Sequence, residues 1–210
     1  MRRDRGFTII ELLTACAIVV VLAGCLIALL PIMQNAIIGS QCTSRLQTLG
    51  RAMTLYVQDN NQTLPGSDTP TFGQTQGIWF TYQELLRPYL NLPESQQAKC
   101  FACPVDKDFY PAFPSYVFNG ANEYNAAFLG VAGKRIPAIT EPSRTLMLVE
   151  GCAVFSKSWH ALNNRTAHND ARSYACFVDG HAAAVAIYAS GAPLNAGVNP
   201  PPGYEYKWGD

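Results

Sequence analysis

The first 59 residues carry two hydrophobic patterns in succession. From residue 7 to residue 33 apolar residues follow one another almost without interruption, and Glu11 is the only charged residue among them. The run from Phe7 to Leu30 would be about 36 Å long as a helix at roughly 1.5 Å per residue. This length is sufficient to cross a bilayer. The pattern therefore predicts a transmembrane helix over residues 7–33.

Beyond residue 33 the apolar positions fall on one helical face. They recur at spacings of four, three, four and three, which is an amphipathic stripe: Cys42, Leu46, Leu49, Met53 and Tyr56. Asp59-Asn60-Asn61, followed by Pro65-Gly66, is a helix-stop signal. We expect residues 34–59 to continue the helix as an amphipathic half whose stripe packs under a folded domain.

The sequence of residues 60–210 contains short helix, strand and turn patterns, which together predict a globular domain. Residues 60–78 are rich in turn-forming residues and predict a surface loop. Thr81 to Glu84 has the spacing of a capping box and predicts the start of a short helix. Strands are expected at 115–120 and 145–150, and the second of these is apolar enough to be central in a sheet.

The C-terminal part predicts a hairpin and a tail. Residues 173–188 alternate around Asp179-Gly180, which is a strong hairpin signal. The last 20 residues contain Pro200-Pro201-Pro202 and several aromatic residues, and predict an irregular tail that wraps the sheet. The fold class expected is α+β, with a long N-terminal helix packed on a small antiparallel sheet.

Composition and charge narrow the functions further. The chain has 210 residues, of which 49% are apolar and 14% charged, and its net charge is zero. The sequence pI is about 6.8. No basic patch lies beyond the N-terminal leader, so nucleic acid is not an expected partner.

The N-terminal leader and its junction carry the most specific motif. Arg2, Arg3 and Arg5 precede Gly6-Phe7, and Glu11 follows five positions after the glycine. A carboxylate within a membrane helix costs about 2.5 to 3.5 kcal/mol, so it requires a partner. The segment Arg-Gly-Phe-Thr-Ile-Ile-Glu-Leu-Leu resembles the N-terminus of type IV pilins and of type II secretion pseudopilins.

This resemblance implies a set of roles and partners. A prepilin peptidase and methyltransferase would remove the leader, residues 1–6, by cutting between Gly6 and Phe7, and would methylate Phe7. Glu11 would serve assembly with further copies and other pilin-like subunits, because its carboxylate can pair with the Phe7 amine of a neighbouring helix. The implied function is a structural subunit of a type IV pilus or pseudopilus.

A second resemblance involves the globular domain. The segments concerned are Cys103-Pro104-Val105-Asp106, Pro114 to Gly120, Pro142 to Glu150, and His168 through Asp179-Gly180-His181. They are similar to a group of pilin-like proteins, abundant in planctomycete-type bacteria, that have a C-terminal signature running from His to Asp-Gly. With both ends included, the resemblance spans nearly the whole chain.

The basic leader also predicts the orientation of the chain. Positively charged residues stay on the cytoplasmic side, so we expect a single-pass protein of the bacterial inner membrane. Residues 60–210 would be extracytoplasmic, in the periplasm or, after assembly, at the cell surface.

Alternatives from other classes use the same helix. An ordinary signal anchor would not be cut. Leu22-Ala23-Gly24-Cys25 resembles a lipobox, in which Cys25 would be lipidated, but the chain stays apolar after Cys25 where lipoproteins turn polar. In either case the protein would be a membrane-anchored binding module that does not polymerise.

Seven cysteines offer several chemistries. Cys16 and Cys25 lie in the membrane segment and act as small apolar residues. Cys100 and Cys103 form a Cys-x-x-Cys pair, for which a structural disulfide, a redox motif and a zinc half-site are the candidates. Three residues are available to complete a zinc site: His160, His168 and His181. Cross-pairing with one of three other cysteines is a further alternative: Cys42, Cys152 or Cys176.

The C-terminal signature suggests one more site. Asp170 and Asp179 offer the oxygen ligands that calcium prefers, so calcium is a candidate cofactor, although Asp179 also has a local role in the turn. The chain lacks the common hydrolase, P-loop and zinc-protease motifs. We therefore expect a protein that is not an enzyme.

Overall fold

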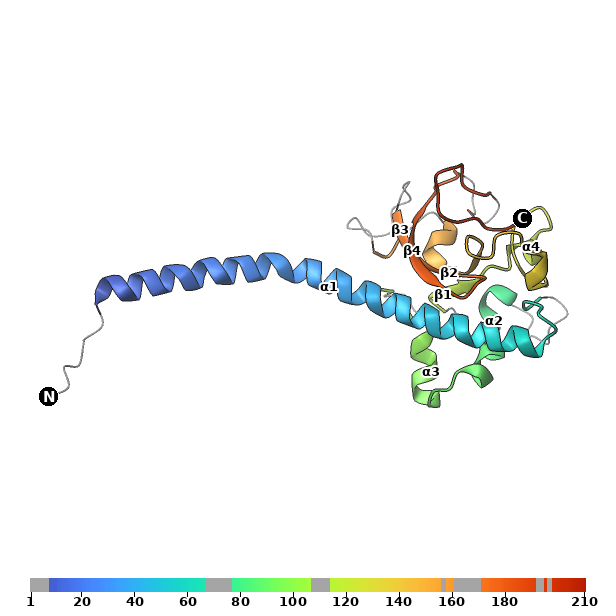
Figure 1. Cartoon of the computed structure of the whole chain (residues 1–210), viewed down its shortest axis with the longest axis horizontal. Coiled ribbons are helices and arrows are strands. Elements are labelled where there is room, and N and C mark those ends of the chain that lie inside the picture. Colours follow the sequence, from blue (N-terminus) through green and yellow to red (C-terminus); the bar gives the residue numbers. More distant parts are fainter. Residues whose placement is uncertain are drawn as a thin grey trace. The chain divides into compact units, whose positions relative to one another are not determined.

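The computed structural model describes residues 8–66, 77–106, 114–155, 158–160, 171–191, 195 and 198–210. The chain divides into two compact units, Met1–Ile38 and Gly39–Asp210. Helix α1, Ile9–Asp59, contributes to both (Figure 1). Each unit is described by itself below.

The first unit consists of the N-terminal part of α1. Its segment Ile9–Leu30 is long and apolar enough to cross a membrane, and none of it is buried within the protein. Every residue from 8 to 30 is exposed. The predicted apolar helix is therefore present, and its side chains have no protein neighbours that would remove them from solvent.

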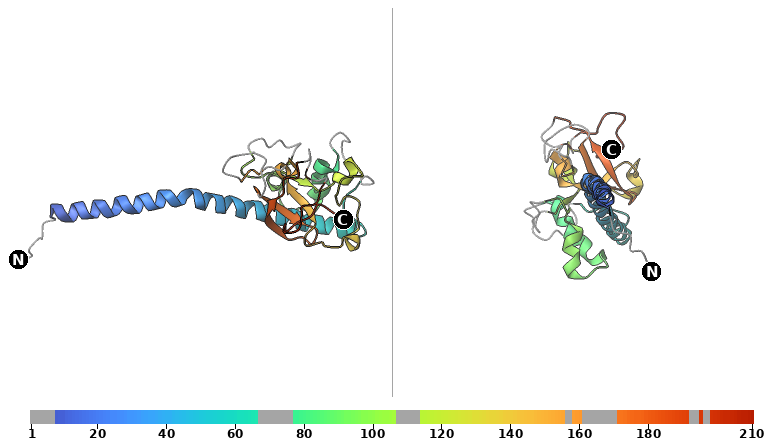
Figure 2. Two further views of the ribbon diagram at one scale, coloured as in Figure 1. Left: turned by 90° about the horizontal axis from the view of Figure 1, so that it is seen from above. Right: turned by 90° about the vertical axis from the view of Figure 1, so that its left-hand side faces the viewer.

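The second unit begins with the remaining part of α1, where the predicted stripe is confirmed. Each stripe residue is at most 6% exposed: Cys42, Leu46, Leu49, Met53 and Tyr56. The sheet lies on one side of this part of the helix and α3, Glu94–Cys100, lies on the other (Figures 1 and 2). The end of α1 at Asp59 also agrees with the sequence.

Four antiparallel strands form the sheet in the order β1-β2-β3-β4. Their bounds are Tyr116–Phe118 for β1, Leu146–Glu150 for β2, Ala171–Phe177 for β3 and Ala182–Ile187 for β4. All five residues of β2 are buried and the strand has a neighbour on each side. The predicted strands, the central position of β2 and the α+β pilin-like fold are thus confirmed.

The turn between β3 and β4 differs from the sequence interpretation. The Asp179-Gly180 pair is typical of a two-residue turn, but four residues, 178–181, separate the two strands. Gly180 has the positive φ, of 91°, whereas Asp179 is not among the residues with positive φ. Aspartate tolerates a positive φ, but here the adjacent glycine takes it without a steric cost.

Short helices complete the unit. Their bounds are Ile78–Leu86 for α2, Arg87–Tyr89 for η1, Ala121–Tyr124 for α4, Ile136–Ala138 for η2 and Gly151–Phe155 for η3. The predicted capping box at Thr81 was wrong, because α2 begins earlier and Gly77 is its N-cap. The Thr81 hydroxyl instead donates to the Gly77 carbonyl oxygen, 3.0 Å away.

The C-terminal tail packs against the sheet, as its aromatic residues predict. Tyr206 and Trp208 are each 1% exposed and belong to the same core as the strands. The Leu146 amide donates to the Lys207 carbonyl oxygen at 3.0 Å, and the Lys207 amide donates to the Arg144 carbonyl oxygen at 2.8 Å. The tail thereby holds the start of β2 in place.

Candidate functional site

The N-terminal motif forms a reciprocal cap at the start of α1. The Thr8 amide and hydroxyl both donate to Glu11 Oε2 at 2.8 Å, and the Glu11 amide donates back to Thr8 Oγ1 at 3.4 Å. This is the capping-box arrangement, which satisfies amides that the first helical turn leaves free. Glu11 therefore has a local partner within its own chain, which the sequence interpretation did not foresee.

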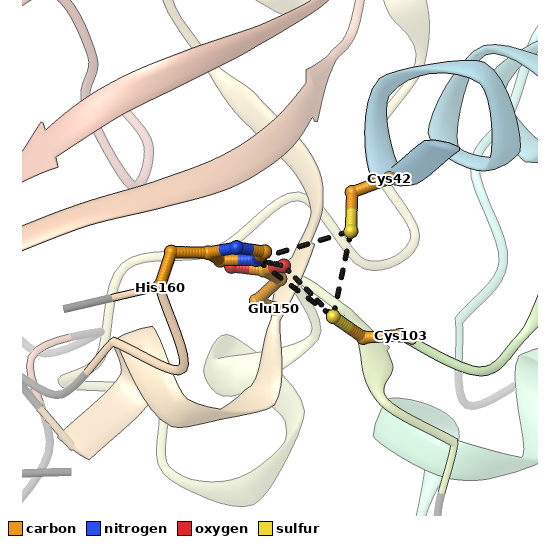
Figure 3. A group of neighbouring side chains, drawn as sticks. All are labelled: Cys42, Cys103, Glu150 and His160. Atoms are coloured by element: carbon orange, nitrogen blue, oxygen red, sulfur yellow. Dashed lines mark hydrogen bonds and ion pairs between the residues drawn. The ribbon is translucent and has the colours of Figure 1, made fainter. Parts of the chain in front are cut away.

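A second group of chemical side chains lies inside the globular unit. One ligand atom from each of four residues falls within 4.8 Å of all the others: Cys42, Cys103, Glu150 and His160. We call these residues the Cys-His-Glu cluster. Figure 3 shows their side chains converging from four separate segments of the chain.

The two sulfur atoms come from α1 and from the loop after α3. Cys42 lies on the buried stripe of α1 and is 0% exposed, and Cys103 is 3% exposed. Their Sγ atoms are 3.4 Å apart. Arg45, one turn after Cys42, donates to the Ala102 carbonyl oxygen and so holds the loop that carries Cys103 against the helix.

Glu150 is the last residue of the central strand and is 0% exposed. Its Oε2 atom accepts hydrogen bonds from Ser173 Oγ at 2.7 Å and from the Tyr174 amide at 3.0 Å. Its Oε1 atom faces His160 Nε2 at 2.7 Å and Cys103 Sγ at 3.5 Å. One carboxylate oxygen is therefore fixed by β3, while the other points into the cluster.

His160 reaches the cluster from a short described segment, residues 158–160. Its amide donates to Ser158 Oγ at 3.0 Å, and the Ser158 hydroxyl donates to the Arg172 carbonyl oxygen in β3. Its ring packs edge-on against Tyr174, with the ring centroids 4.7 Å apart. His160 Nε2 lies 3.8 Å from Cys42 Sγ and 3.7 Å from Cys103 Sγ.

Hydrogen bonds between members of the cluster shift the pKa values of Cys42, Cys103 and His160. The hydrogen bond between the two sulfurs lowers the pKa of Cys42 to about 6 and raises the pKa of Cys103. Burial by itself would lower the pKa of His160, but the hydrogen bonds to Cys42 and Glu150 outweigh it and raise this pKa to about 9. The lowered pKa of Cys42 favours a thiolate there, next to an imidazole whose raised pKa favours its charged form.

Tyr116 borders the same group. Its side chain is 0% exposed, and its hydroxyl has no hydrogen-bond partner among the described residues. Burial raises the pKa of Tyr116, and the nearby charge of Cys42 raises it further. The hydroxyl is therefore close enough to interact electrostatically with Cys42, although the two do not meet hydrogen-bond geometry.

The other predicted site residues fall into two groups. Gly6, Phe7, His168 and Asp170 lie outside the described residues. Cys100 and Cys103 are free thiols in the structure, and their disulfide stays a prediction.

The predicted calcium ligand Asp179 has a role in the turn. Its Oδ1 atom accepts from the His181 amide at 3.1 Å and contacts His181 Nδ1 at 2.6 Å. The His181 ring stacks on Phe177, with the centroids 4.2 Å apart. Asp179 and His181 thus stabilise the hairpin, and calcium binding with Asp170 stays a prediction.

Sequence reasoning named some members of the cluster in other roles. From the sequence, His160 is one of three candidate zinc ligands, and Cys42 is both a candidate disulfide partner and an expected core residue. Glu150 was assigned only to a strand. A carboxylate that ends an otherwise apolar strand, Thr145 to Glu150, was the available signal.

Comparison with known families identifies the N-terminal segment. Residues 1–24 match the family model described as the prokaryotic N-terminal methylation motif. The motif supports a pilin-like protein that is processed as a prepilin, and it points to a structural role. The apolar helix that follows is long enough to cross a membrane, which fits a membrane-anchored protein. No curated protein and no solved structure matches the chain.

Proposed function

We propose that the protein is a structural subunit of a type IV pilus-like fibre or a type II secretion pseudopilus, and not an enzyme. It is inserted with its N-terminus in the cytoplasm, cut between Gly6 and Phe7, and methylated on Phe7. The observation that carries the proposal is an apolar helix, exposed over residues 8–30, that begins at a methylation motif.

The exposed apolar surface requires an environment other than water. Contiguous apolar patches of this size mark membrane or protein contacts. The 22 residues Ile9–Leu30 span about 33 Å, which matches the thickness of a bilayer core. After extraction from the membrane, the same surface can be covered only by helices of other subunits, which is the packing expected in the core of a fibre.

One carboxylate oxygen of Glu11 remains available for a contact with another subunit. Thr8 occupies Oε2, while Oε1 has no hydrogen-bond partner in the part of the chain that the structure describes. Cleavage after Gly6 creates a cationic amine on Phe7 only four residues away along the sequence. The Phe7 amine of a neighbouring subunit would pair with Oε1 and offset the cost of burying the carboxylate.

Intact-mass measurement of the protein from its native membrane tests the processing. We expect a mass that lacks residues 1–6 and includes one additional methyl group. A Gly6→Val variant should keep the leader and serves as the uncut control. A full-length mass for the wild-type protein, or a mass beginning at a lipidated Cys25, would contradict the proposal.

Two native thiols allow a test of assembly. Cys16 and Cys25 are both exposed on α1, and nine residues at roughly 100° each place them on opposite faces of the helix. Oxidation of assembled wild-type protein should give cross-linked ladders, whereas Cys25→Ser should give dimers at most. Glu11→Ala should be cut normally yet form no ladder; ladders equal to wild type would exclude the pairing role of Glu11.

A further inference from the structure

We propose that the Cys-His-Glu cluster binds one zinc ion through Cys42 Sγ, Cys103 Sγ, His160 Nε2 and a carboxylate oxygen of Glu150. Four ligand atoms from these residues lie within 4.8 Å of one another in the second unit. The inference is independent of the proposed fibre, because every ligand belongs to Gly39–Asp210.

The distances within the cluster match a tetrahedral zinc site. With zinc–sulfur bonds of about 2.3 Å and zinc–nitrogen or zinc–oxygen bonds of about 2.1 Å, two sulfurs would be about 3.8 Å apart and a sulfur would be about 3.6 Å from the nitrogen or oxygen. The observed separations are 3.4 Å between the sulfurs, 3.7 and 3.8 Å from sulfur to nitrogen, and 3.5 Å from Cys103 Sγ to Glu150 Oε1.

The separation between His160 and Glu150 would have to increase when the metal binds. His160 Nε2 and Glu150 Oε1 are 2.7 Å apart and share a hydrogen bond, whereas two zinc ligands of this kind would be about 3.4 Å apart. The change is a replacement of the shared proton by the metal, since zinc requires the neutral imidazole nitrogen as a lone-pair donor. The separations among Cys42 Sγ, Cys103 Sγ and His160 Nε2 would change by no more than about 0.4 Å.

The donor types select the metal. Two thiolates exclude calcium and magnesium, which prefer oxygen ligands, while sulfur, imidazole and carboxylate in a tetrahedron suit zinc. Because the protein supplies all four ligands, the site has no open position for a water or a substrate. Such closed sites are structural rather than catalytic.

The surroundings also fit a bound cation. The second oxygen of Glu150 is held by Ser173 and Tyr174, which fixes the carboxylate as outer-shell partners of metal ligands do. A fully buried carboxylate is costly without positive charge. His160 provides that charge at 2.7 Å while it is protonated, and a divalent ion would provide it once the imidazole is neutral. The hydroxyl of Tyr116, which lacks a described partner, is near enough to Cys42 to interact electrostatically with its thiolate.

Metal analysis of the full-length protein in detergent, purified through a tag that binds no metal, tests the proposal. We expect about one zinc ion per chain in the wild type and less than a tenth of that in Cys103→Ser. Cys100→Ser is the matched control: it alters the other cysteine of the same Cys-x-x-Cys pair and should retain the zinc. Equal zinc in Cys103→Ser and wild type would overturn the proposal.

Two further measurements keep the proposal testable if a variant folds poorly. Wild-type protein stripped of metal under reducing conditions should bind one Co²⁺ ion, with the intense visible bands of four-coordinate cobalt and a sulfur-to-cobalt charge-transfer band. Ser173→Ala, which leaves all four ligands in place, should weaken zinc binding by about 10- to 100-fold.

A disulfide between Cys42 and Cys103 is the competing outcome. The protein isolated from its native membrane without reductant would then contain no stoichiometric zinc, and a peptide map would contain the linked Cys42 and Cys103 peptides. That result would overturn the proposal. Peptide maps with both cysteines free to react after removal of zinc would support it.

Discussion

The two parts of helix α1 have the same backbone conformation and opposite surroundings. Residues 8–30 are all exposed, whereas Leu46, Leu49 and Met53 are completely buried. The C-terminal part of α1 has its partners within its own chain, while the N-terminal part must find them in lipid or in other subunits. One continuous helix therefore joins a region that packs within its own chain to a region that is exposed throughout residues 8–30.

Replacement of a leucine by alanine should give the largest difference in stability loss between the two parts of α1. Leu49 is 0% exposed and Leu22 is 58% exposed. Leu49→Ala should lower the free energy of unfolding by about 2 to 5 kcal/mol, because it leaves a cavity between α1 and the domain. Leu22→Ala should change it by less than about 0.5 kcal/mol.

Thermal unfolding in detergent, followed by near-ultraviolet circular dichroism, measures both variants. Aromatic residues of the second unit supply this signal, so the experiment reports on the packed part of α1. A loss for Leu22→Ala equal to that for Leu49→Ala would mean that the monomer itself covers the apolar part.

Removal of zinc should act on the packed part alone. A bound ion at a free concentration 100 times its dissociation constant adds about 2.7 kcal/mol of stability. A strong chelator should therefore lower the melting temperature of the wild type. It should leave that of Cys103→Ser unchanged, and a matching shift in this variant would point to an effect of the chelator elsewhere.

Two glycines of α1 give a matched pair for the comparison. A Cβ atom on Gly50 would lie 2.6 Å from Cys176 Sγ and 3.3 Å from the Gly180 carbonyl oxygen, whereas a Cβ on Gly24 would meet nothing within 4 Å. Gly50→Ala should cost about 1 to 3 kcal/mol through overpacking. Gly24→Ala should be neutral or favour the helix by up to about 1 kcal/mol.

Chemical denaturation of the two glycine variants checks this pair. An equal loss in both would contradict the absence of neighbours around residue 24. If Gly24→Ala leaves unfolding unchanged but reduces cross-linked ladders, the position is where helices of two subunits approach closely.

The smallest effect is expected at the cap of α1. Thr8→Ala removes the hydroxyl that donates to Glu11 and accepts from its amide. We expect a loss of about 1 kcal/mol, confined to the first turn because the exposed part has no tertiary contacts to transmit it. Hydrogen exchange of the amides at residues 9–12 should accelerate, with no change in the melting of the domain; a lower melting temperature would contradict this confinement.

Local signals in the sequence account for most of the fold. The stripe from Cys42 to Tyr56, the apolar strand at 145–150 and the Asp179-Gly180 hairpin each depend on neighbours close in sequence, and each is present. The start of α2 was wrong because Gly77, with a φ of 64°, allows the helix to begin one turn before Thr81. A capping motif loses its meaning when an earlier start is available.

The Cys-His-Glu cluster could not be predicted as a unit. Its members come from four segments, and Cys42 and His160 are separated by 118 positions in the sequence. Zinc motifs are usually recognised from two ligands close in sequence, but here the neighbour of Cys103 in space is Cys42 and not Cys100. Only the packing of α1 against the sheet brings the four residues together.

The position of Cys42 has a mechanical consequence. Among the described residues, it is the first fully buried side chain along α1. Gly39, one turn earlier, is also buried and lies against Tyr174, so a pull along α1 would reach the domain over the turn from Gly39 to Cys42. With zinc bound, the force on Cys42 would be transmitted directly to β2 and to the two segments that carry Cys103 and His160. These connections would be loaded together, so the buried residues of the stripe would not separate from the domain one turn at a time. A protein built in this way would resist stretching at the point where α1 joins the sheet through Cys42.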